Sequence, residues 1–161
     1  MVRNNMRYFA LCWPVIVLAL SDIISKFWLL LGYDLGAKGR VTILPFMDFI
    51  LVWNKGVSYS LFTSDSQLAR WALVALMLGL CVFLSRWLLS TQNSIEKWGL
   101  TLILGGALGN SFDRIYHGAV VDFVALHYKS FHWYIFNLAD VYIVMGACIL
   151  AYFMFFLQKR Q

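Results

Sequence analysis

The chain has 161 residues, of which 61% are hydrophobic and only 13% are charged, whereas charged residues make up about a quarter of an ordinary water-soluble domain. The formal net charge of +5 is modest, and the basic residues are too dispersed to form the clusters typical of nucleic-acid binding. The composition therefore excludes a water-soluble domain and a disordered chain, and it predicts a small protein that crosses a membrane several times.

Four apolar segments approach the roughly 20 residues that a helix needs to cross a hydrocarbon layer about 30 Å thick. They cover residues 9–31, 71–89, 98–112 and 138–157. The first follows Arg3 and Arg7 as the apolar region of a signal peptide would, but it is too long for one, so we expect it to be retained. The third contains Gly105 and Gly109 on one helical face, which permits close contact between helices.

The distribution of basic residues predicts the orientation of these spans. Arg3, Arg7, Arg86, Lys97, Lys159 and Arg160 lie in the short segments on the side of the two termini. A similar number on the other side is spread over longer segments and mixed with acidic residues. Both termini are therefore expected in the cytoplasm, with residues 32–70 and 113–137 on the outer face.

The first outer segment, residues 33–63, is predicted to form a small β-hairpin. Residues 41–43 and 49–53 favour strands, and Asn54-Lys55-Gly56 supplies turn residues before the strand-like residues 57–62. Residues 64–70 are polar and are expected to lead into the second span as a short interfacial helix. The predicted fold is a single, mainly α-helical membrane domain over residues 1–161, with four transmembrane helices and a small extracytoplasmic β-hairpin or sheet.

Charged residues in or near the spans need a reason, because an ionised side chain at the bilayer centre costs about 2.5–3.5 kcal/mol on insertion scales. Arg86 lies near the cytoplasmic end of its span and can reach the interface. Asp22 and Lys26 are four residues apart on the first span, which predicts an intrahelical ion pair. Asp113 has a basic neighbour in Arg114, which supplies an opposite charge next to it.

Two aspartates remain after the other acidic residues have been explained. Asp34, Asp48 and Asp65 read as ordinary outer-loop charges, and Glu96 marks the cytoplasmic turn. Asp122 lies among valines and Phe123, and such apolar surroundings raise the pKa of a carboxyl group. Asp140 lies three residues after Asn137, a predicted N-cap, where a carboxylate accepts free N–H groups and meets a favourable helix dipole.

Two carboxyl groups in such different surroundings suit peptide hydrolysis. The charged carboxylate takes a proton from water while its neutral partner polarises the scissile carbonyl group. Spacing alone leaves a second interpretation open, in which Asp140 only caps a helix and Asp122 only pairs with Arg114.

Other kinds of site receive less support from the sequence. His117, His127 and His132 lack metal-ligand spacing, and Ser25 and Lys26 point apart on a helix. Cys12, Cys81 and Cys148 are odd in number and lie within apolar runs, which favours neither a disulfide framework nor a zinc site. We therefore expect no metal and no cofactor.

Two motifs around the aspartates resemble those of lipoprotein signal peptidase, also called signal peptidase II, a family of bacterial inner-membrane aspartic proteases. The family's pattern G-N-x-x-D-R-x-x-x-G-x-V-V-D-F matches residues 109–123, and its pattern F-N-x-A-D matches residues 136–140. Upstream, D-x-x-[ST]-K resembles residues 22–26, and N-x-G resembles residues 54–56. The clearest departure follows Gly56, where Val57-Ser58-Tyr59 replaces the small residues and Phe that are common in the family.

The resemblance implies an enzyme that cleaves diacylglyceryl-modified prolipoproteins on the amino side of the lipidated cysteine. It implies that Asp122 and Asp140 are catalytic. Asn54, Gly56, Asn110, Arg114 and Asn137 would support the dyad or contact substrate, while Asp22, Lys26 and Asp113 would hold the architecture. It further implies an inner-membrane location, a site toward the periplasmic face, lipids as neighbours, inhibition by the cyclic peptide globomycin and a monomeric protein.

Two other functions remain open at the level of the residues. A small transporter or proton-relay subunit could use Asp22, Lys26, Asp122 and Asp140, although a relay should thread the membrane, whereas these residues gather toward one face. A non-catalytic assembly factor could use Asp113, Arg114 and Asp122 for helix docking.

Overall fold

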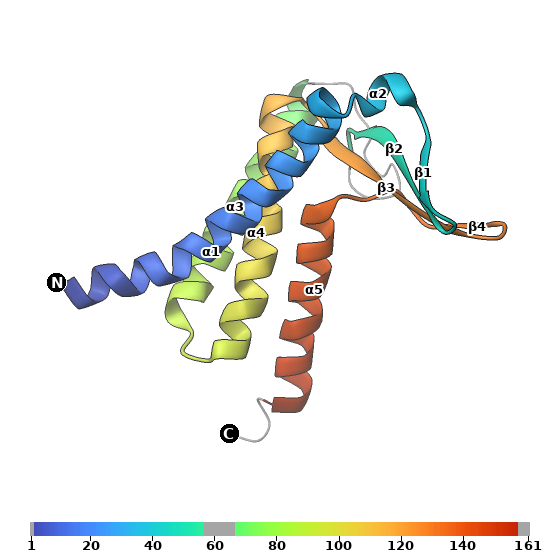
Figure 1. The fold of residues 1–161 in the computed structure, drawn as a ribbon. Helices are drawn as coiled ribbons and strands as arrows, with labels where there is room; N and C mark the ends of the chain where they lie inside the picture. The colour runs from blue at the N-terminus through green and yellow to red at the C-terminus, as the bar shows by residue number, and fades with distance from the viewer. Residues whose placement is uncertain (1, 57–66, 158–161) are drawn as a thin grey trace.

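The computed structural model describes residues 2–56 and 67–157, and four long helices dominate it (Figure 1). Their bounds are Val2–Phe27 (α1), Gln67–Ser90 (α3), Ser94–Tyr116 (α4) and Leu138–Tyr152 (α5). Short π-helical turns extend two of them, Trp28–Gly32 (η1) after α1 and Phe153–Leu157 (η3) after α5. Each predicted apolar segment thus lies on a helix. The helices that contain the first three segments start earlier than predicted, whereas α5 together with η3 matches the predicted bounds 138–157.

Within the described residues, three segments are long and apolar enough to cross a membrane, Leu11–Gly32, Gln67–Ser90 and Leu138–Leu157. The fourth helix, α4, is not among them. It carries Glu96 and Lys97 near its start and Asp113 and Arg114 near its end. A membrane crossing by α4 therefore remains a prediction.

The sheet has four antiparallel strands in the order β1-β2-β3-β4. The strands are Val41–Leu44 (β1), Met47–Asn54 (β2), Val120–Tyr128 (β3) and Phe131–His132 (β4). The predicted strand residues 41–43 and 49–53 are confirmed, but they pair with each other. The predicted partner, residues 57–62, lies outside the described residues. We did not predict β3, although its run of valines is typical of a buried strand.

A short helix does occur in the outer segment, but not where we expected it. It covers Leu35–Lys38 (α2) and begins at Asp34, whose side chain accepts a hydrogen bond from the Ala37 N–H group. Gln67–Arg70, the described part of the predicted interfacial helix, forms the first turn of α3. Residues 67–70 thus lead into the second span as predicted, but as part of the long helix itself. Residues 64–66 of the predicted interfacial helix lie outside the described residues.

Glycines allow α4 to pack closely against α1 and α5. A Cβ atom at Gly105 would lie 2.6 Å from Leu18 Cβ, and one at Gly109 would overlap the Asp22 carboxylate. On another face of α4, a Cβ at Gly106 would overlap the backbone of Ala139. The expected close packing at Gly105 and Gly109 is confirmed, and it brings Asp22 next to the last turns of α4.

The sheet lies at one end of the helices, where α4 ends and α5 begins (Figure 1). A hydrophobic cluster that includes Val15, Leu84, Leu100 and Leu150 joins α1, α3, α4 and α5. A second cluster, centred on Phe123, joins the sheet to η1 and α2. The first cluster holds the helices together, and the second attaches the sheet to the segment that follows α1.

Candidate active site

Asp122 is held in the middle of the antiparallel sheet. It is the third residue of β3, and its backbone lies opposite Val52 of β2. On the other side of β3, Phe136 exchanges backbone hydrogen bonds with Val124. This pairing places Asn137, the residue after Phe136, against the Asp122 side chain. Because Asn137 is also the N-cap of α5, the start of α5 is held beside β3.

Asp140 occupies the first turn of α5, as predicted. Asn137 is the N-cap, and its side-chain oxygen accepts a hydrogen bond from the Asp140 N–H group at 3.0 Å. In return, Asp140 Oδ2 accepts a hydrogen bond from the Asn137 N–H group at 3.2 Å. This capping box confirms the predicted N-cap and fixes the orientation of the Asp140 carboxyl group.

Two asparagine side chains connect the two carboxyl groups. Asn137 Nδ2 donates to Asp122 Oδ1 at 2.6 Å and to Asn110 Oδ1 at 3.1 Å. Asn110 Nδ2 in turn donates to Asp140 Oδ1 at 3.0 Å. Asp122 and Asp140 are therefore linked by a continuous chain of amides contributed by α4 and the N-cap of α5.

The environment of Asp122 favours its protonated form. Desolvation by burial raises the pKa of Asp122 to about 6, and the nearby charge of Asp140 acts in the same direction. Hydrogen bonds from Asn54 and Asn137 oppose this shift because they stabilise the charged carboxylate. The shift agrees in direction with the one expected from the apolar neighbours of Asp122 in sequence.

The end of β2 supplies a third asparagine to the site. Asn54 Nδ2 donates to Asp122 Oδ2 at 3.0 Å, and Asn54 Oδ1 accepts a hydrogen bond from the Gly56 N–H group at 3.1 Å. Arg114 Nη2 donates to the Gly56 carbonyl oxygen at 2.7 Å. Arg114 thus holds the segment after β2 in place through a backbone contact.

The predicted ion pair between Asp22 and Lys26 is confirmed at 2.7 Å, and Lys26 also lies 2.8 Å from Asp113. Lys26 Nζ further donates to Asn110 Oδ1 at 3.0 Å. The described ion pairs include none between Asp113 and its neighbour Arg114, because consecutive helical residues point in different directions. The described ion pairs likewise contain none between Asp122 and Arg114.

Asp22 and Asp113 each also accept a backbone hydrogen bond. Asp22 Oδ1 accepts from the Ala139 N–H group at 2.9 Å, and Asp113 Oδ2 accepts from the Val121 N–H group at 3.1 Å. Val121 and Ala139 directly precede Asp122 and Asp140 in the chain. The buried ion cluster therefore fixes the backbone beside both candidate catalytic residues.

The two aspartates line one cavity of about 560 Å³. Its polar end contains Asn54, Gly56, Asn110 and Arg114 besides the aspartates. Its walls come from apolar side chains of α3 and α5 that sequence reasoning missed: Leu73, Leu76, Met77, Leu80, Ile143 and Val144. The sequence carried no local signal for these residues, because they resemble every other apolar residue of the spans.

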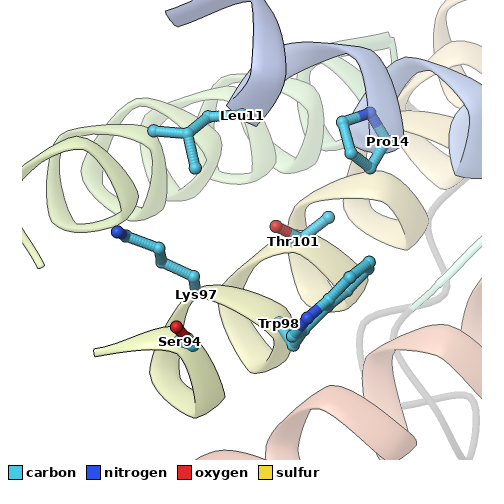
Figure 2. Close-up of a pocket in the computed structure, with 6 residues that line it drawn as sticks. All are labelled: Leu11, Pro14, Ser94, Lys97, Trp98 and Thr101. Carbon is cyan, nitrogen blue, oxygen red and sulfur yellow. The ribbon is translucent and has the colours of Figure 1, made fainter. Parts of the chain in front are cut away.

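A smaller hollow of about 190 Å³ lies between α1 and α4 at the opposite end of α4 (Figure 2). It is lined by Leu11, Pro14, Ser94, Lys97, Trp98 and Thr101, and no aspartate lines it. No group of three His, Cys, Asp or Glu side chains in the described part of the chain is arranged to hold a metal ion. The candidate chemistry is therefore concentrated in the larger cavity.

One outer acidic residue is not the ordinary loop charge that we expected. Asp48 lies within β2, is only 4% exposed, and has His127 Nε2 at 3.2 Å and Arg40 Nε at 3.5 Å. A hydrogen bond from the Thr42 side chain lowers the pKa of Asp48, with the nearby His127 and Arg40 acting in the same direction against burial. Asp48 therefore ties together the outer strands, away from the larger cavity.

The chain is similar in sequence to known proteins over most of its length. A model of the family Signal peptidase (SPase) II matches residues 14–156. The lipoprotein signal peptidase of Nitrobacter hamburgensis is 45% identical over 137 residues, which cover 83% of this chain and 84% of that protein. The one from Beijerinckia indica is 47% identical over 129 residues, covering 80% and 77%.

Solved structures show the same fold. A bacterial membrane enzyme determined at 2.3 Å resolution superposes with a TM-score of 0.78 at 19% identity, over 94% of this chain and 90% of that chain. A second bacterial membrane enzyme, at 1.9 Å, gives a TM-score of 0.77 at 18% identity, over 92% and 94%.

Proposed function

This chain belongs to the signal peptidase II family, and on that premise we propose that Asp122 and Asp140 form the catalytic dyad with which it removes signal peptides from prolipoproteins. The enzyme is a peptidase, hence a hydrolase, of a bacterial membrane. One observation carries the assignment. Two carboxyl groups from separate elements line one cavity and are joined by asparagine amides, while the pKa of one of them is raised.

The proposed mechanism uses the difference between the two carboxyl groups. Asp122, whose pKa is raised to about 6, holds the proton, and Asp140 acts as the base. Asp140 takes a proton from a water molecule as the water attacks the scissile carbonyl carbon, and Asp122 donates a hydrogen bond to the carbonyl oxygen. Asp140 then passes the proton that it took from water to the leaving nitrogen as the C–N bond breaks. Because the pair is coupled, the proton belongs to the dyad as a whole.

The asparagines are proposed to orient the dyad. Each acid accepts a side-chain amide N–H group, from Asn54 and Asn137 at Asp122 and from Asn110 at Asp140. Amides hold a carboxylate in place without supplying a full positive charge. Arg114 and Gly56 would fix the loop that carries Asn54, while Asp22, Lys26 and Asp113 hold the backbone beside both acids.

The cavity supports a substrate anchored in lipid. Its walls are apolar, and Leu76 and Val144 on these walls are 69% and 53% exposed. We propose that the acyl chains of a diacylglyceryl-modified cysteine lie along these walls and that the bond on the amino side of this cysteine reaches the dyad. Globomycin is proposed to occupy the same cavity.

The placement in the membrane follows from the same proposal. All four long helices would cross the bilayer, with both termini in the cytoplasm and the dyad toward the periplasmic face. The single domain is expected to act as a monomer. A proton relay or an assembly factor is less well supported, because Asp122 and Asp140 lie at one end of the helices and line a cavity of about 560 Å³.

Purified protein in detergent with a fluorescent diacylated lipobox peptide tests the proposal. Cleavage is expected before the lipidated cysteine, together with inhibition by globomycin and no cleavage of the peptide without its lipid. Undiminished cleavage by Asp122→Asn or Asp140→Asn would show that the dyad is assigned wrongly.

A further inference from the structure

The last turn of α4 has a partner that neither the motifs nor the proposed mechanism uses. Arg70, in the first turn of α3, donates from Nε to the Arg114 carbonyl oxygen at 3.0 Å and from Nη2 to the Ile115 carbonyl oxygen at 2.7 Å. The last four carbonyl groups of a helix lack N–H partners within it, and a cation there is favoured by the helix dipole. Arg70 therefore caps the C-terminus of α4 from a different helix.

The same guanidinium group lies against the turn that leads to Asp122. Gly118 in this turn has a φ of +81°, and a Cβ atom there would lie 3.3 Å from Arg70 Nη1. Only two residues later the chain enters β3, and Asp122 is the third residue of that strand. A glycine is required at this position by its backbone conformation, and its small size lets Arg70 lie close to the turn.

Two routes connect Arg70 to the candidate catalytic aspartate. The first is the covalent chain through Gly118 into β3. The second runs through α4, because the backbone of Arg114 bonds to Arg70 while its side chain bonds to Gly56, beside the Asn54 amide that donates to Asp122. Both routes end at Asp122, the first at its backbone and the second at its carboxyl group.

We propose that Arg70 is a positioning residue, which clamps α3 to the turn between α4 and β3 and thereby sets the position of Asp122 in the active site. The kinetic consequence rests on the proposed function, whereas the clamp itself does not. The packing of α3 against α4 does not depend on Arg70, because other residues of the two helices share the hydrophobic core cluster. These residues are Cys81, Leu84 and Leu88 of α3 and Leu100 and Leu104 of α4. Loss of Arg70 should therefore disturb the turn without detaching the helix.

The test compares Arg70→Ala and Arg70→Lys with Arg86→Ala, which removes an exposed cation from the far end of the same helix. Arg70→Ala is expected to lower kcat roughly 10- to 100-fold, the scale of a misplaced catalytic group, with little change in KM. Arg70→Lys should retain intermediate activity, because an ammonium can donate to a carbonyl oxygen but lacks the guanidinium fork. Arg86→Ala should behave as the wild type.

Hydrogen exchange gives a readout that does not depend on catalysis. In Arg70→Ala, amides of residues 118–122 should exchange faster, while those of the α3–α4 core and of residues 126–134 stay unchanged. Wild-type kcat in Arg70→Ala, unchanged exchange at residues 118–122, or faster exchange throughout the protein would each overturn the proposal. If Asp122→Asn remains active, the dyad assignment fails, and the exchange result still decides whether Arg70 clamps the turn.

Discussion

The described structure places four aspartates near one another in two different settings. Asp22 and Asp113 share the ammonium group of Lys26, and all three side chains are at most 2% exposed. Asp122 and Asp140 instead accept hydrogen bonds from neutral amides and line a cavity of about 560 Å³. Asn110 belongs to both settings, because its oxygen accepts from Lys26 and its nitrogen donates to Asp140.

The two settings separate the aspartates that hold the structure together from those that are proposed to carry out the reaction. The carboxyl groups of Asp22 and Asp113 are occupied by the Lys26 ammonium group and do not line the larger cavity, whereas those of Asp122 and Asp140 are held by amides and line it. The ion cluster also bonds to the backbone N–H groups of Val121 and Ala139, the residues before the two acids. The cluster can therefore act as a rigid base for the dyad.

The largest predicted effect comes from neutralising the dyad itself. Asp122→Asn and Asp140→Asn should each lower kcat by about 10²- to 10⁴-fold, because each removes a proton donor or acceptor. Asp34→Asn is the matched control, since Asp34 is exposed and has a φ of 52°, which asparagine tolerates. Cleavage of the lipidated peptide measures the effect, and equal activity in the control and either dyad variant would refute the contrast.

Breaking the ion cluster should chiefly affect stability. Lys26→Met leaves two buried carboxylates without their cation, and removing one partner of a buried ion pair costs about 3–5 kcal/mol. The unfolding temperature in detergent should fall far more than in Lys97→Met, which changes a lysine outside the cluster. If Lys26→Met unfolds at the wild-type temperature, the cluster does not support the fold.

A smaller effect should follow from separating α1 and α4. In Gly109→Ala the new methyl group would overlap the Asp22 carboxylate, so the helices must move apart. Overpacking of this kind costs roughly 1–3 kcal/mol. Gly79→Ala on α3 is the control, because nothing lies within 4 Å of its Cβ position, and it should be neutral or slightly stabilising. The unfolding temperatures of the two variants give the comparison, and equal values would contradict it.

Local interactions were predictable from the sequence, and interactions between distant segments were not. The N-cap at Asn137 with Asp140 three residues later, and the pair Asp22–Lys26, each depend on one helix and were predicted from spacing. The choice of Lys26 as the partner of Asp113 depends on how α1 packs against α4, which no local pattern reveals. Arg70 was missed for the same reason.

The sheet shows the same limit. Residues 120–128 carry a strand-like pattern, yet the motif around Asp122 gave no indication of which strand lies beside it. In the structure β3 pairs with β2, so that Val52 lies opposite Asp122 and Asn54 opposite Val120. The hydrogen bond from Asn54 to Asp122 depends on this register, which is set by packing between segments 68 residues apart.

The hydrogen bond from Asn54 to Asp122 allows the test with the smallest expected effect, because it changes the pKa of the aspartate that is proposed to carry the proton. The rate should fall as pH rises through the pKa of Asp122, about 6 in the wild type, since the protonated form is needed. The Asn54 hydrogen bond lowers this pKa, so Asn54→Ala should move the alkaline limb of the pH–rate profile to higher pH while reducing kcat about 10-fold.

The matched control is Asn93→Ala, which removes the N-cap of α4 at its far end. Asn93→Ala should lower the free energy of unfolding by about 1 kcal/mol, and it should leave the alkaline limb of the pH–rate profile at its wild-type position. An alkaline limb that stays in place or moves to lower pH in Asn54→Ala would mean that Asn54 is only a turn residue. Because the two variants lose a similar hydrogen-bonding side chain, a shift confined to Asn54→Ala cannot arise from lost stability.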